Sequence, residues 1–262
     1  MLLVPTAIQT SALIIGGGGG GYSFYPVIYS NDAGYAYNLS RITFITTLVN
    51  LTGTFKYNSS EGGTQYVEYY IALGQIIPNS QYGAYYIQLI IIFVTNGNVW
   101  ILDWQVQAWS NNSGNPYKEY STYGTITYGS GSSANLSYLF NLTIKATLNS
   151  QGQITSAWVY IANAETGKIY FSQTINLQYL IPDKQVFFEV EDPLNGTTPV
   201  KFPILSSSNY IFVNALASNS SVIYATGLPL YNSVEFIMQP PHAYAYVVPS
   251  FGSATQGVHY YW

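Results

Sequence analysis

The sequence predicts an all-β protein built as an antiparallel, two-sheet β-sandwich. Tyr, Phe and Trp make up 17% of the 262 residues, and aromatic and β-branched side chains favour the pleated, half-buried surface of a sheet. No segment shows a sustained apolar stripe of helical period with charged flanks. Short apolar segments instead alternate with clusters of Gly, Asn, Ser and Pro, a pattern typical of a sandwich.

The expected strands follow one another closely along the chain. They lie at residues 41–51, 65–73, 84–94, 99–109, 122–128, 136–148, 154–161, 168–177, 186–191, 210–216, 234–238, 243–248 and 258–262. Turn residues predict hairpins between neighbours, for example Asn96-Gly97 and Thr166-Gly167. No change of composition marks a boundary after residue 30, so residues 30–262 are expected to form one domain.

Residues 1–29 predict an N-terminal apolar arm and a glycine-rich linker. The first fifteen residues are mostly apolar and contain no Lys or Arg, and the run Gly16 to Gly21 follows. This segment fits neither a signal peptide nor a membrane-spanning helix, because the first needs positive charge and the second about 20 apolar residues. The alternatives are a trimmed signal remnant, a stray β-strand, and an arm whose residues 4–15 dock as an extra strand on a neighbouring subunit.

Charge and composition restrict the function classes. Seven basic and eleven acidic residues give a net charge of −4, and no basic stripe marks the chain as a nucleic-acid binder. A surface of amides and hydroxyls changes little in charge as pH falls, which favours an acidic environment. There is no cysteine, and His242 and His259 are too isolated to indicate a metal site. No cofactor is expected.

Asn-x-Ser/Thr sequons are frequent, which supports an extracellular or cell-surface glycoprotein. They begin at Asn38, Asn50, Asn58, Asn111, Asn135, Asn141, Asn195 and Asn219.

The most informative segment is the strand at 185–192, which holds three of the eleven acidic residues within four positions. Alternation along a strand puts Phe187, Glu189 and Glu191 on one face. Two carboxyl groups about 7 Å apart on a partly desolvated face oppose each other's ionisation, which suits acid–base chemistry in an acidic medium. The alternative is an acidic strand edge in water.

The order of several short motifs resembles the eqolisin-type glutamic peptidases. The motifs are SNDAGY at 30–35, TGTF at 52–55, GTQYVEYYIALG at 63–74, YIQ at 86–88, IANAETGK at 161–168 and VED at 190–192. The resemblance covers about residues 30–262 and implies a jelly-roll or concanavalin-like sandwich of two antiparallel sheets. The chain departs from the family pattern at Asp32, where the family has Trp, and at Phe187, where it has Glu.

The resemblance also implies a catalytic pair. Glu191 would be the general base that activates water, and Gln88 would hold that water and stabilise the oxyanion. Candidate cleft residues are Glu189, Asp103, Trp104 and Tyr69. For Asp103 and Trp104 the alternative is packing in the core or on the surface. The alternative for Gln88 is a strand glutamine that satisfies a backbone group.

Two function classes remain open at this point. The first is a secreted, acid-active endopeptidase that hydrolyses polypeptides without a cofactor. The second is a non-catalytic extracellular subunit of a filament, cell surface or virion, assembled by donation of the strand at 4–15. A carbohydrate-binding sandwich has only the aromatic composition behind it.

Overall fold

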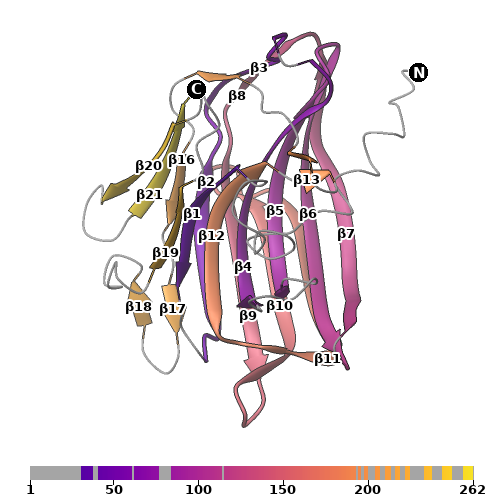
Figure 1. The fold of residues 1–262 in the computed structure, drawn as a ribbon, viewed down its shortest axis with the longest axis vertical. Coiled ribbons are helices and arrows are strands. Elements are labelled where there is room, and N and C mark those ends of the chain that lie inside the picture. The colour runs from indigo at the N-terminus through magenta and orange to yellow at the C-terminus, as the bar shows by residue number, and fades with distance from the viewer. Residues whose placement is uncertain are drawn as a thin grey trace.

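The computed structural model consists of two large antiparallel sheets stacked face to face (Figure 1). The structure describes residues 31–37, 41–60, 62–76, 84–113, 115–192, 194–195, 198–199, 204–206, 210–213, 216–218, 222–224, 233–237, 244–249 and 256–261. Every regular element within these ranges is a strand. The predicted all-β sandwich is therefore confirmed. Residues 1–29 lie outside the described ranges, so the expected arm and its docking remain predictions.

The front sheet has the strand order β19-β1-β12-β4-β5-β6-β7. Its strands are β1 (Asn31–Tyr37), β4 (Gln65–Ile76), β5 (Ala84–Thr95), β6 (Val99–Asn112), β7 (Asn115–Ser130), β12 (Gln185–Asp192) and β19 (Ser233–Ile237). The acidic strand β12 thus lies between β1 and β4, although β1 and β12 are far apart in sequence.

The back sheet has the order β11-β10-β9-β2-β16-β21-β20. Its strands are β2 (Phe44–Asn50), β9 (Leu139–Leu148), β10 (Gln153–Asn163), β11 (Ile169–Pro182), β16 (Tyr210–Val213), β20 (Tyr244–Pro249) and β21 (Gln256–Tyr261). Smaller sheets are formed by β3 (Gly53–Lys56), β8 (Ser133–Leu136), β13 (Leu194–Asn195), β14 (Thr198–Pro199), β15 (Ile204–Ser206), β17 (Leu216–Ser218) and β18 (Val222–Tyr224).

The hydrophobic core lies between the two large sheets. Alternate residues of β4, β5 and β6 face it, as the period of two in a strand requires. Aromatic rings join the layers: the ring centroids of Trp104 on β6 and Phe171 on β11 are 5.0 Å apart. Burial of each large apolar side chain contributes about 1.5–3 kcal/mol, so this core fixes which face of each strand points inward.

The hairpin between β5 and β6 forms where the sequence predicts it, with a longer loop than the expected two residues. The loop spans residues 96–98, and the Asn96 side chain accepts hydrogen bonds from the backbone amides of Asn98 and Val99 at 3.0 and 3.1 Å. Gly97 has φ 86°, a conformation that glycine adopts readily. A Cβ atom there would lie 2.9 Å from the Tyr57 ring, so residue 97 must be glycine on two grounds.

Glu119 of β7 joins the edges of the two sheets. Its carboxylate accepts hydrogen bonds from the backbone amides of Gln178 and Tyr179 on β11, at 2.8 and 2.6 Å, and from the Ser110 hydroxyl at 2.6 Å. Charge-assisted hydrogen bonds of this kind are among the stronger ones in proteins. One carboxylate thus links β7 to β11, beside the hydrogen bonds from the Tyr117 and Tyr120 hydroxyls to Gln178 and Gln173 at 3.0 Å each.

Candidate functional site

The front sheet carries polar side chains on the face opposite the core, here called the distal face. On β4, β5 and β6, Tyr69, Leu89 and Trp104 belong to the core, so the alternate positions lie on the distal face. These include Glu68 and Gln88, both with no exposed surface, and Gln105, which is 1% exposed. Buried polar groups are costly unless they are hydrogen-bonded. Their concentration on one face indicates a site rather than solvated surface.

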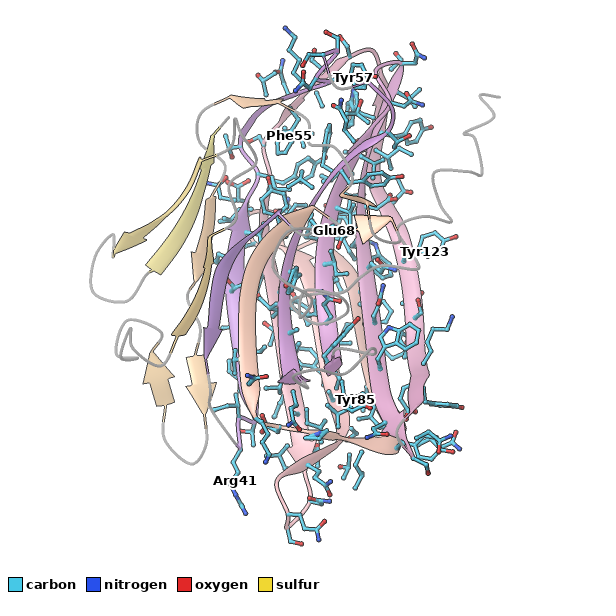
Figure 2. All side chains as sticks on the ribbon, viewed as in Figure 1. Arg41, Phe55, Tyr57, Glu68, Tyr85 and Tyr123 are labelled. Atoms are coloured by element: carbon cyan, nitrogen blue, oxygen red, sulfur yellow. The ribbon has the colours of Figure 1, made fainter. Side chains whose placement is uncertain are left out.

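Four acidic residues occupy one row across this sheet, here called the carboxyl row. Asp32 pairs with Glu191, Glu191 with Glu68, Glu68 with Ile92, and Ile92 with Asp103. The row thus holds four of the eleven acidic residues of the chain. Figure 2 shows Glu68 on the front sheet, away from both ends of the long axis.

The spacing of the row sets its electrostatics. Residues directly opposite each other on antiparallel strands have Cβ atoms about 5 Å apart. Two ionised carboxylates at that distance repel by about 3 kcal/mol at an effective dielectric constant of about 20. Ionisation of a carboxyl at one position of the row therefore opposes ionisation of a carboxyl at the adjacent position.

The sheet register does not bring the two predicted catalytic positions together. Gln88 pairs with Ala72, and Ala72 pairs with Phe187, whereas Glu191 lies in the row of Glu68 and Ile92. The offset is four residues along the strands and two strands across, or about 17 Å between Cα positions at about 3.4 Å per residue and about 4.8 Å per strand. That distance exceeds what the two side chains and one water molecule span.

Gln88 itself is placed as a functional amide would be. Its side chain lies on the distal face, fully buried, and neither its Oε1 nor its Nε2 has a hydrogen-bond partner among the described residues. The alternative that Gln88 satisfies a backbone group is not seen in that part of the chain. Its predicted catalytic role stays a prediction.

Two candidate cleft residues lie in the core instead, and their predicted cleft positions are wrong. Tyr69 is fully buried in the hydrophobic core. Trp104 packs against Phe171 and fills the space above Gly124, where a Cβ atom would lie 2.7 Å from its ring. Both errors arise from strand parity: a shift of one residue reverses the face on which a side chain lies.

Asp103 lies on the distal face, in the carboxyl row. Burial raises its pKa to about 6, and a hydrogen bond with Thr125 of β7 partly offsets this effect. Its Oδ1 has no hydrogen-bond partner among the described residues. The Asp103 carboxyl is therefore mostly protonated at pH values below about 6.

Glu189 occupies the next row, opposite Gly34 on β1 and Tyr70 on β4. In register it lies two residues closer than Glu191 to the row of Gln88. The structure does not describe its side chain, so its part in the site stays a prediction.

Sequence reasoning missed Glu68 and Gln105. Glu68 is the single acid of β4, and Gln105 follows Asp103 by two residues on β6. Their signal is present in the sequence, since Glu68 interrupts a run of aromatic and aliphatic residues and Gln105 alternates with Asp103 and Gln107 along β6. It could be interpreted only once the register had placed them beside β12 and β5.

Other predicted features are tested in part. Among the described side chains, no group of three or more His, Cys, Asp or Glu residues could hold a metal ion. None of the described segments forms a helix long and apolar enough to cross a membrane. Of the sequons, Asn111 and Asn135 are exposed, whereas Asn141 accepts hydrogen bonds from Thr46 and Thr143. Asn38 and Asn219 lie outside the described ranges.

Comparison with known proteins identifies the fold. No family profile matches the sequence, and no curated protein matches it. Scytalido-glutamic peptidase bound to a peptide-based transition state analog matches with a TM-score of 0.55 at 13% identity, over 88% of this chain and 98% of that chain. SCP-B, a member of the eqolisin family of peptidases in complex with the tripeptide Ala-Ile-His, gives the same values. The eqolisin-like sandwich implied by the motifs is therefore confirmed as a fold.

Proposed function

We propose that this protein is an acid-active endopeptidase that hydrolyses polypeptides, with Glu191 as the general base. The observation that carries the proposal is the carboxyl row on the distal face of the front sheet. The fold that this chain shares with glutamic peptidases supports peptide hydrolysis as the reaction to which these carboxyls contribute. Fold alone does not fix activity, so the argument depends on these residues.

The proposed reaction is the addition of water to a peptide bond. The Glu191 carboxylate takes a proton from water while the oxygen attacks the carbonyl carbon, whose π electrons move to the carbonyl oxygen. Collapse of the tetrahedral intermediate breaks the C–N bond, and the amine leaves with the proton that Glu191 had accepted. The products are a carboxylic acid and an amine, so atoms and charge balance without a cofactor.

The distal face also offers groups that suit an extended peptide. Buried amide side chains at Gln88 and Gln105 have atoms without partners among the described residues, and such atoms can bind backbone N–H and C=O groups. The row of Gln88 lies four residues from the row of Glu191, and an extended substrate crosses that distance in about four residues at about 3.3 Å each. Gln88 is thus better placed to bind the substrate chain than to share the attacked water.

Low charge and buried, protonated acids support an acidic working environment. The net charge is −4 with only 7% charged residues, and burial raises the pKa of Asp103 to about 6. Eight sequons favour an exported, glycosylated protein. We therefore place the activity outside the cell, in an acidic medium.

The test compares wild type with Glu191→Gln and Gln88→Ala on an acid-denatured protein substrate from pH 2 to 7. Glu191→Gln is expected to lose at least a thousandfold in kcat while its circular dichroism and thermal midpoint stay close to those of wild type. Gln88→Ala is expected to raise KM more than it lowers kcat. Wild type that cleaves nothing at any acidic pH, or Glu191→Gln that cleaves normally, would refute the proposal.

A further inference from the structure

Glu68 stands out among the residues that the proposed reaction does not use. It lies on β4 with no exposed surface, and its position is directly opposite Glu191 on β12. Figure 2 shows it on the front sheet. Direct cross-strand neighbours are the closest pairs that a sheet provides. Glu68 is therefore better placed than Gln88 to act on Glu191.

The surroundings of this pair supply acids and no cations from the strands of the row. β1, β12, β4, β5 and β6 contain no Lys, Arg or His. The titratable positions on the distal face near Glu68 are Asp32, Glu191 and Asp103 in its own row, Glu189 and Tyr70 in the row on one side, and Tyr66 of β4 in the row on the other. No cation of these strands therefore offsets the repulsion between opposed carboxyls, and protonation of one of the two relieves it.

A second feature marks the face as a binding surface rather than an acidic cluster alone. Gln105 lies on the same face as Asp103, two residues along β6, and its buried Oε1 has no hydrogen-bond partner among the described residues. Gln88 lies on the same face, and neither its Oε1 nor its Nε2 has a hydrogen-bond partner among the described residues. Buried amides without partners carry a desolvation cost that a bound polar chain removes.

We propose that Glu68 is a positioning residue that shares one proton with Glu191 and thereby sets the pH range of the enzyme. This inference rests on the proposed role of Glu191. Over the acidic range one carboxyl of the pair is ionised and the other holds the proton, so the base is available while the repulsion is avoided. Loss of the second proton at higher pH puts a second negative charge beside the Glu191 carboxylate. That charge opposes the negative charge developing on the carbonyl oxygen in the transition state, so the active range ends there. The pair titrates in two steps that belong to both residues together.

The experiment measures kcat against pH for wild type, Glu68→Gln, Glu68→Asp and Glu165→Gln. Glu68→Gln keeps a hydrogen-bonding group and cannot ionise, so its alkaline limb is expected to move up by at least one pH unit, with peak kcat within about tenfold of wild type. Glu68→Asp should retain the limb. Glu165, on an exposed turn, provides a matched control whose profile should not change.

A second readout does not depend on activity. The infrared carboxyl band of each protein is followed from pH 2 to 8, and each variant is subtracted from wild type. In both Glu68→Gln and Glu191→Gln, the same part of the band is expected to disappear, namely the carboxyl signal of wild type that loses its proton at the highest pH. Glu165→Gln should keep this signal.

The outcomes separate the two proposals. An unchanged pH profile in Glu68→Gln, or infrared steps for Glu68 and Glu191 that are independent of each other, would overturn the shared proton while leaving Glu191 as the base. If wild type is inactive but the infrared titrations of Glu68 and Glu191 are coupled, the proposed hydrolase activity is refuted and the shared proton is supported. If Glu68→Gln fails to fold, Glu68→Asp together with Glu191→Gln still tests the coupling.

Discussion

At the scale of single residues, buried acidic side chains such as Asp183 make the properties of the protein depend on pH. Asp183 lies in the turn between β11 and β12, is 2% exposed, and has no hydrogen bond of good geometry to either carboxylate oxygen among the described residues. Burial raises its pKa from 3.8 to about 7, although the nearby backbone amide of Ile42 acts in the opposite direction. A buried carboxyl of this kind remains neutral throughout the acidic range.

Asp183 makes stability depend on pH in a defined direction. Between pH 3.8 and about 7 the unfolded chain releases this proton while the folded protein keeps it, so the free energy of unfolding falls as pH rises. The loss is about 1.4 kcal/mol per pH unit, or on the order of 4 kcal/mol over the window. Urea denaturation of wild type at pH 4 and pH 7 should show greater stability at pH 4.

Asp183→Asn isolates this contribution. An amide cannot ionise, so the variant should lose most of the difference in stability between pH 4 and pH 7, whereas Glu165→Gln should retain it. A difference of the same size in Asp183→Asn and wild type would show that other groups carry the pH dependence.

At the scale of elements, the clamp between β7 and β11 makes a testable contribution to stability. Glu119 accepts two backbone amides of β11 and one hydroxyl of β6. Glu119→Ala leaves these donors without that acceptor and should cost about 2 kcal/mol. Urea denaturation at neutral pH measures the loss. Lys118→Ala, an exposed neighbour on the same strand, should change stability by less than about 0.5 kcal/mol. Equal effects of the two substitutions would argue against the clamp.

Strand β7 also combines core packing with exposed aromatic rings. Gly124 and Gly129 face Trp104 and Trp100, whose rings lie 2.7 and 2.4 Å from where a Cβ atom would be. Tyr123 precedes Gly124, is 43% exposed and pairs with Gln105 on the distal face; Figure 2 shows it at the edge strand. The glycines of β7 thus leave room for the tryptophan rings of β6 on one face, while Tyr123 lies on the opposite, distal face.

Under the proposed function, Tyr123 contacts a peptide bound on the distal face. Tyr123→Ala should raise KM several-fold and leave kcat within about twofold, because a ring at the edge of the sheet contributes binding rather than chemistry. Steady-state kinetics at the acid optimum measure both constants. A fall in kcat with unchanged KM would contradict this assignment.

At the scale of the whole molecule, the sequence predicted the architecture well because the signals were local. Alternating apolar positions and turn residues such as Gly97 and Gly167 located the strands, and each expected segment coincides with an observed strand. β1, β3, β8, β13, β14, β15 and β18 were missed, because they are short or rich in small residues and make weak patterns.

The site was harder to predict because it depends on register. The sequence singled out Glu191 and Gln88, but it could not reveal that Glu191 lies opposite Glu68, since that pairing joins segments more than a hundred residues apart. The sequence-based assignment of Tyr69 and Trp104 to the cleft failed for the same reason, because which face a strand residue occupies depends on the register of the sheet. Long-range pairing is a property of the folded sheet and leaves little trace in any one segment.

The central claim is that carboxyl chemistry in the row hydrolyses peptide bonds in acid. The most direct measurement is mass spectrometry of new chain ends formed from an unfolded protein substrate at pH 3, with wild type and Glu191→Gln at equal concentration. The account predicts internal cleavage by wild type and none by Glu191→Gln. Intact substrate in both samples, with both proteins folded, would contradict it.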